Sequence, residues 1–143
     1  MDTLNLLGGG FAEAVQPMSL LFALLGVLLG TVVGVLPGIG PISAIAILIP
    51  VSFGMEPVHG LIMLCGIYYG SMYGGSITAT LIKTPGEVAS AVTAIDGYEM
   101  ARRGRARAAL ATAAIGSFVA GTLAIVGLSF LSPGLVTAAR LLG

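Results

Sequence analysis

The sequence predicts an all-α polytopic membrane protein whose transmembrane helices are accompanied by proline- and glycine-broken or re-entrant segments. Of its 143 residues, 57% are hydrophobic and only 8% are charged, whereas about a quarter of the residues of a soluble domain are charged. Several uncharged stretches approach the roughly 20 residues that a helix needs to cross a bilayer. Two short segments rich in proline and glycine, 37–41 and 84–86, interrupt these stretches. Irregular backbone within a membrane is tolerated only where it is buried in protein or lines a cavity.

The first predicted span covers residues 18–36, which carry no charge and would extend about 28 Å as a helix. Pro17 suits the first turn of this helix, because its missing N–H is not needed there. Before it, Gly8–Gly10 argue against a long helix. We therefore expect only a brief interfacial helix around residues 11–16.

Three glycines of this span, Gly26, Gly30 and Gly34, are spaced four residues apart. They lie along one face of the predicted helix, which suits close packing against another helix. The break that follows begins at Pro37 and ends at Pro41, and it cannot continue as regular helix. The glycines are thus interpreted as packing residues, and the break as the candidate functional element.

The next two predicted segments are 42–57 and 58–82. The first is short for a crossing, so it is either part of a broken or re-entrant helix or a short span. The second contains many hydroxyl groups, which must face other helices or a wet cavity, or bond to carbonyls of their own helix. We expect Gly74 and Gly75 to weaken or interrupt this helix near its middle.

The second break also carries a signal for the start of a helix. Thr84 and Glu87 have the spacing of a capping box, and Pro85 falls at the first helical position. This pattern predicts a helix that begins at the break and ends near residues 96–97. A basic helical turn then closes at Gly104.

Residues 83–107 are predicted to form a cytoplasmic loop, because they hold four of the six basic residues in the cluster Arg102, Arg103, Arg105 and Arg107. Binding of nucleic acid or anionic lipid is the alternative interpretation of this cluster. The last predicted span, 108–131, is uncharged and is expected to stop at Ser132-Pro133-Gly134. The amino terminus lies outside if both 18–36 and 42–57 cross the membrane, and inside if 37–53 is re-entrant.

Enzyme chemistry is poorly supported by the sequence. It contains no phosphate-binding loop, no metal-ligand spacing around the single His59, and no paired carboxylates in the predicted spans. The single Cys65 is interpreted as a small buried hydrophobe. The two breaks are more informative, because a helix amino terminus suits an anion and the carbonyls at a helix end suit a cation such as sodium. Lys83 is either a substrate contact or an anchor that reaches toward the headgroups.

The pattern Gly26-x3-Gly30-x3-Gly34-x2-Pro37-Gly38-Ile39-Gly40 resembles the glycine-rich signature of the large membrane subunit of tripartite tricarboxylate transporters. The loop 83–86 and the segment 96–106 also resemble the first cytoplasmic region of that family. This resemblance covers nearly the whole chain. It implies the amino-terminal portion of a longer subunit, and half of an inverted-repeat transporter.

The resemblance further implies a multi-pass permease of the bacterial inner membrane that takes up citrate-like carboxylates without ATP, driven by an ion gradient, expected to be sodium. Its implied partners are a small membrane subunit and a periplasmic solute-binding protein. We expect no resident cofactor or metal apart from a bound sodium ion, and no nucleic-acid partner. A non-transporting scaffold packed through its glycine faces is the alternative function, and a membrane enzyme ranks third.

Nine residues are accordingly predicted to shape the substrate site, and five to form a structural motif. The predicted site residues are Gly38, Ile39, Gly40, Ser43, Ser76, Thr78, Thr84, Pro85 and Gly86, and the predicted structural residues are Gly26, Gly30, Gly34, Pro37 and Pro41.

Overall fold

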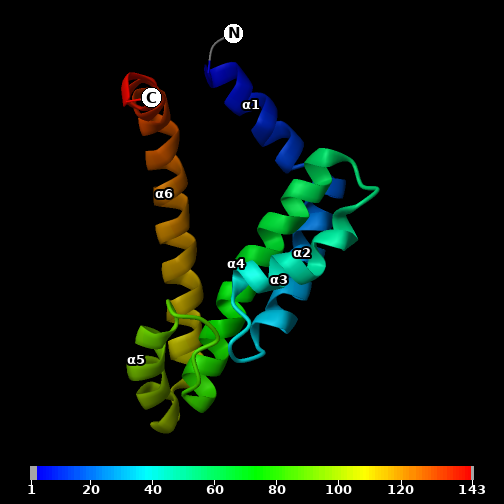
Figure 1. Cartoon of the computed structure of the whole chain (residues 1–143). Helices are drawn as coiled ribbons and strands as arrows, with labels where there is room; N and C mark the ends of the chain where they lie inside the picture. Colours follow the sequence, from blue (N-terminus) through cyan, green and yellow to red (C-terminus); the bar gives the residue numbers. More distant parts are fainter. Residues whose placement is uncertain (1–2, 143) are drawn as a thin grey trace. The chain divides into compact units, whose positions relative to one another are not determined.

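A computed structural model describes residues 3–142, and every regular element in that range is helical (Figure 1). The prediction of an all-α protein is therefore confirmed. The chain divides into two compact units, one ending at Leu110 and the other beginning at Ala111, which are described separately. The helices are α1 (Thr3–Ala14), α2 (Pro17–Gly34), α3 (Pro41–Leu48), the 3-10 helix η1 (Ile49–Ser52), α4 (Pro57–Ile82), α5 (Ala91–Arg102) and α6 (Ala106–Leu142).

Helices α1 and α2 differ in how well the sequence predicted them. Pro17 occupies the first turn of α2, as expected. In contrast, α1 runs without interruption through Gly8–Gly10, so the prediction of only a brief helix after these glycines was wrong. A glycine costs a helix about 1 kcal/mol relative to alanine, and this cost lowers the stability of α1 without ending it.

The centre of the first unit is the contact between α2 and α4, which lie side by side and run in the same direction (Figure 1). Their parallel direction follows from the contacts, because Gly26, Gly30 and Gly34 of α2 face Met63, Ile67 and Ser71 of α4 in that order. Three glycines of α4 face the backbone of α2 in return. These are Gly66, Gly70 and Gly74.

The two glycine rows let the backbones of α2 and α4 touch directly. A Cβ atom at Gly66 would lie 2.7 Å from the carbonyl oxygen of Ala23, and one at Gly74 would lie 2.6 Å from that of Thr31. Close approach of this kind is how helices associate in membranes, where lipid is as apolar as the side chains. The interface explains why these glycines are buried in a unit whose large apolar side chains are mostly exposed.

Helix α4 is continuous across Gly74 and Gly75, so the expected interruption does not occur. Both glycines are buried, with Gly74 against α2 and Gly75 against the loop at Gly86. Tertiary contacts of this kind override a weak helix propensity.

The segment between α2 and α4 returns the chain to the level at which α2 began. It contains α3 and η1, and it runs back along α4 from the Tyr68–Met72 region to Gly60, where a Cβ atom would lie 3.6 Å from Ser52 Cβ. The predicted segment 42–57 therefore consists of a short α-helix, one 3-10 turn and irregular backbone.

The loop from residue 83 to residue 90 differs from its prediction. Lys83 ends α4 in the left-handed region, with φ +57°, and α5 begins only at Ala91. The Thr84–Glu87 capping box is therefore wrong, and the Thr84 hydroxyl instead donates to the Ile82 carbonyl. The chain does not start a helix at Pro85 because the next residue, Gly86, packs back against α4.

Helix α5 also continues past residues 96–97, where the sequence predicted its end. Gly97 is buried against α4, and a Cβ atom there would lie 2.9 Å from Thr80 Oγ1. Gly97 thus lets the two helices approach each other. The helix ends at Arg102, and Gly104, with φ +76°, closes the basic turn as expected.

Helix α6 is 37 residues long and continues through Ser132-Pro133-Gly134, so the predicted stop is wrong. A proline removes its own N–H from the helix and crowds the carbonyl of the preceding turn, yet such residues are tolerated in apolar helices. Within the described residues, Pro17–Gly34 and Ala106–Leu131 are long and apolar enough to cross a membrane. Cys65 is exposed in this chain, contrary to the expectation that it would be buried.

Candidate functional site

The two breaks meet beside α4. Gly86, in the second break, packs so closely that a Cβ atom there would lie 2.5 Å from Gly75 Cα and 3.0 Å from the Gly34 carbonyl oxygen. In the first break, a Cβ atom at Gly40 would lie 3.7 Å from the Glu87 Cβ. Segments separated by more than 40 residues in the sequence therefore form one site.

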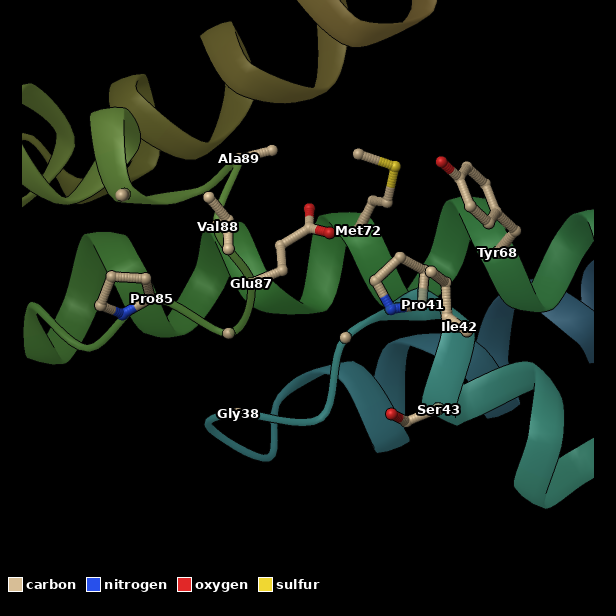
Figure 2. A pocket seen from close by; sticks show the side chains of 13 residues that line it. Gly38, Pro41, Ile42, Ser43, Tyr68, Met72, Pro85, Glu87, Val88 and Ala89 are labelled. Carbon is tan, nitrogen blue, oxygen red and sulfur yellow. The ribbon is translucent and has the colours of Figure 1, made fainter.

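An open groove of about 920 Å³ lies where the breaks meet (Figure 2). This volume falls within the range of pockets that bind small molecules. The groove is lined by residues of both breaks and of α3, α4 and α5, namely Gly38, Gly40, Pro41, Ile42, Ser43, Tyr68, Met72, Pro85, Gly86, Glu87, Val88, Ala89 and Ala91.

The first turn of α3 provides main-chain donors to the groove. Gly40 caps this helix with extended backbone, Pro41 is its first residue, and no side chain caps it. The earliest helical hydrogen bond is donated by the Ala44 N–H to the Gly40 carbonyl, at 3.0 Å. The N–H groups of Ile42 and Ser43 precede this bond and so belong to the unpaired donors of a helix start, where the helix dipole is positive.

Glu87 is the charged member of the groove lining. Its carboxylate points into the space between Met72 and Pro41 (Figure 2). Glu87 lies in the loop between α4 and α5, outside the helices that are long and apolar enough to cross a membrane, and burial raises the pKa of its carboxyl group above the usual 4.5. Desolvation has this effect because it disfavours the charged form.

The main chain of Glu87 is held by Ser90. The Ser90 hydroxyl accepts a hydrogen bond from the Glu87 N–H at 3.2 Å and donates one to the Glu87 carbonyl at 2.9 Å. Ser90 is itself buried, with 3% exposure. A short polar side chain that bonds nearby backbone in this way fixes a loop in place of a helical turn.

Five of the nine predicted site residues line the groove, namely Gly38, Gly40, Ser43, Pro85 and Gly86. Ile39, Thr84, Ser76 and Thr78 do not. The hydroxyl of Ser76 donates to the Met72 carbonyl at 3.3 Å, and that of Thr78 donates to the Gly75 carbonyl at 3.0 Å. These two side chains are therefore used within α4.

The five predicted structural residues fall into two groups. Gly26, Gly30 and Gly34 are buried in the α2–α4 interface. Pro37 is exposed in the turn after α2, whereas Pro41 is buried at the start of α3 and lines the groove.

Lys83 and His59 lie away from the groove lining. The Lys83 Nζ atom lies 5.6 Å from the ring centroid of Tyr98, a cation–π distance. His59, in the first turn of α4, lies 3.4 Å from a Glu56 carboxylate oxygen, and its ring centroid is 5.1 Å from that of Phe22. Within residues 3–142, no group of three potential metal ligands was found.

Among the residues that sequence reasoning missed are three polar or polarisable side chains of the lining, Glu87, Tyr68 and Met72, and Ser90, which holds the main chain of Glu87. The signal for Glu87 was available, because an acidic residue beside a break in an apolar chain is by default a functional candidate. Its capping-box spacing suggested a purely local role instead. The other three are recognisable only once the loop is known to fold back onto α4.

Apolar helices interrupted by irregular segments, with helix ends gathered around one groove, are a recurring arrangement of secondary transporters. The chain belongs to the tripartite tricarboxylate transporter TctA family, whose model matches residues 20–143. This assignment confirms the family to which the glycine and proline motifs pointed. The family is one of transporters, in agreement with the prediction that the chain is not an enzyme.

The chain is also 57% identical, over all 143 residues, to an uncharacterized 52.8 kDa protein in the TAR-I ttuC' 3' region of Agrobacterium vitis. It spans 28% of the length of that relative. No solved structure matches the chain.

Proposed function

We propose that the chain forms the amino-terminal part of a permease subunit that takes up tricarboxylates or related carboxylates across the bacterial inner membrane. Uptake is driven by an ion gradient, expected to be sodium, and involves a small membrane subunit and a periplasmic binding protein. The observation that carries this proposal is the meeting of the two breaks around one groove. Membership of the TctA family supports it.

The start of α3 is suited to hold a carboxylate group of the substrate. The main-chain N–H groups of Ile42 and Ser43 are at the positive end of the helix dipole, and the Ser43 side chain lines the same groove. Because the groove lining contains no basic side chain, main-chain donors and hydroxyl groups would carry anion recognition.

The parallel direction of α2 and α4 supports one of the two open topologies. With the arginine cluster in the cytoplasm, α4 runs inward toward it, and α2 runs inward as well. In this proposal the segment between them crosses back, and the amino terminus lies outside. On α4 the groove is lined by Tyr68 and Met72, which lie 14 and 10 residues before the end of α4 at Ile82, or about 15–21 Å from its cytoplasmic end.

The glycine faces do not specifically favour the alternative function of a scaffold. The glycines of α2 and α4 pack against each other within the chain. They therefore need no second protein to explain their spacing.

A substitution at Gly38 tests the proposed site. Gly38 has φ +84°, and a Cβ atom added there would meet nothing within 4 Å. A leucine at this position would therefore strain the backbone without a steric clash of its Cβ atom. The left-handed conformation costs an ordinary residue about 1–2 kcal/mol, and asparagine tolerates it better. Gly54 also has φ +84° and open surroundings but does not line the groove, so it provides a matched control.

The experiment measures citrate uptake by membrane vesicles that contain the full-length subunit and its partners, under an inward sodium gradient. We expect Gly38→Leu to reduce uptake about tenfold or more, whereas Gly38→Asn retains most of it and Gly54→Leu leaves it near the wild-type level. Membrane insertion of all three variants is followed by immunoblotting. Wild-type uptake by Gly38→Leu would refute the assignment of the site.

A further inference from the structure

The charge of the groove is unusual for a site that takes an anion. Glu87 is the charged side chain of the lining, and Tyr68 is the other titratable one. Lys83 contacts Tyr98 instead of the groove. Among the described lining residues, an incoming carboxylate would therefore meet a carboxylate and no positively charged side chain.

The Glu87 side chain is held at the centre of the site. Its Cβ would lie 3.7 Å from a Cβ atom at Gly40, and its Cγ would lie 3.6 Å from one at Gly75. Among residues 7–131, no side chain forms an ion pair or hydrogen bond with its carboxylate, and Ser90 bonds only its main chain. A partly buried, unpaired carboxylate favours a proton or a bound cation.

A carbonyl with partial negative charge lies beside the residue that precedes Glu87. The Gly34 carbonyl ends α2, at the negative end of the helix dipole. The residue that would donate to it in a continuing helix is Gly38, and no such bond forms; the Ile39 N–H bonds the Leu36 carbonyl instead. The last turn of α2 has no basic residue. The Gly34 carbonyl faces Gly86, the residue immediately before Glu87.

We propose that Glu87 binds a monovalent cation, either a proton or a sodium ion, which neutralises the groove and so enables it to take a carboxylate. This inference rests on the proposed function, since it assigns the coupling of cation and substrate to one side chain. In this arrangement the cation raises the affinity for the substrate, and the substrate raises the affinity for the cation by the same factor.

The test measures citrate affinity for the full-length subunit purified with its small membrane subunit, without the binding protein. One arm compares sodium with choline at fixed pH, and the other compares acidic with neutral buffer without sodium. For the wild type, we expect one of the two cations to raise citrate affinity about tenfold or more, within the usual range of coupling between sites. The arm that shows the effect identifies the cation.

The quantity compared is the ratio of citrate affinity with the effective cation to citrate affinity without it. In Glu87→Gln this ratio is expected to fall to about one. Glu99→Gln serves as the matched control, because Glu99 is an exposed acid on α5 paired with Arg103 at 3.3 Å, and it should keep the wild-type ratio. An unchanged ratio in Glu87→Gln would overturn the proposal. A wild-type ratio of about one in both arms would also overturn the proposal. If the complex nevertheless binds citrate, the proposed function is not contradicted by that result.

Two further outcomes keep the test decisive. If the wild-type complex fails to bind citrate in every buffer, the proposed function fails rather than the role of Glu87. If Glu87→Gln does not elute as a folded complex, Glu87→Asp is measured instead. Its shorter side chain should shift the cation concentration for half-maximal effect, and an unchanged concentration counts against the proposal.

Discussion

Replacing Gly30 with alanine is the most direct test of the α2–α4 interface. A Cβ atom at Gly30 would lie 2.7 Å from Ile67 Cα and 2.8 Å from Ile67 C, and closer still to the Ile67 carbonyl oxygen. All three atoms belong to backbone, so no flexible side chain can move aside. Ordinary contact with a Cβ begins at 3.4 Å, and the helices must therefore separate locally by about 0.7 Å or more.

The energetic cost follows from this separation. A gap of about 0.5–1 Å forfeits a quarter to a half of the dispersion attraction between the atoms concerned, and overpacking costs about 1–3 kcal/mol. The higher helix propensity of alanine returns up to about 1 kcal/mol. We expect Gly30→Ala to lower the free energy of unfolding by about 2 kcal/mol, because rigid backbone on both sides favours the upper end of the overpacking range.

Unfolding by sodium dodecyl sulfate, followed by circular dichroism of the full-length subunit in mild detergent, measures this loss. Gly9→Ala in α1 and Gly116→Ala in α6 are matched controls, because a Cβ atom at either position meets nothing within 4 Å. They should be neutral or stabilised by up to about 1 kcal/mol. If Gly30→Ala unfolds at the same detergent fraction as these controls, the backbones of α2 and α4 do not pack as closely as described.

Three further predictions concern the groove. Gly86→Ala brings a Cβ atom to 2.5 Å from Gly75 Cα and should reduce citrate uptake about tenfold. Val92→Ala, at an exposed position of α5 outside the groove lining, should not reduce it. Ser90→Ala removes two hydrogen bonds to Glu87 and should cost about 1–2 kcal/mol in the same unfolding assay, with a smaller loss in Thr84→Ala. Burial raises the pKa of Glu87 above 4.5, so the folded protein binds the carboxyl proton more tightly than the unfolded chain does. This contribution to folding stability is complete below pH 4.5 and is lost as the pH rises through the raised pKa. Melting curves of wild type and Glu87→Gln should therefore differ in pH dependence above 4.5, and parallel curves would contradict this reasoning.

The sequence predicted the outline of the fold where the signals were strong and local. The long uncharged segments predicted α2, α4 and α6, and Pro17 and Pro41 are the first residues of α2 and α3. The predictions failed where a local signal competed with a tertiary contact. Gly97 reads as a helix end in isolation, but in the structure it allows close contact with Thr80.

The candidate site, like the fold, was predicted from the sequence only in part. Glycine and proline at Gly38, Gly40 and Gly86 marked the two breaks, because few other residues interrupt apolar helices so clearly. The sequence analysis assigned residues of both breaks to one site, but it did not indicate that the second break would reach the first by folding back along α4. Glu87 consequently became part of the site only through the contact of Gly86 with Gly75.

The sequence by itself determined the helical class, the location of both breaks and the family, because composition, helix length and motif spacing are local properties of the chain. Only the tertiary structure decided that α2 and α4 run parallel, that α4 continues through Gly74 and Gly75, and that the breaks share one groove. The physical reason is that a glycine permits both a break and a close contact. Which of the two occurs depends on whether another backbone lies within reach of its missing side chain.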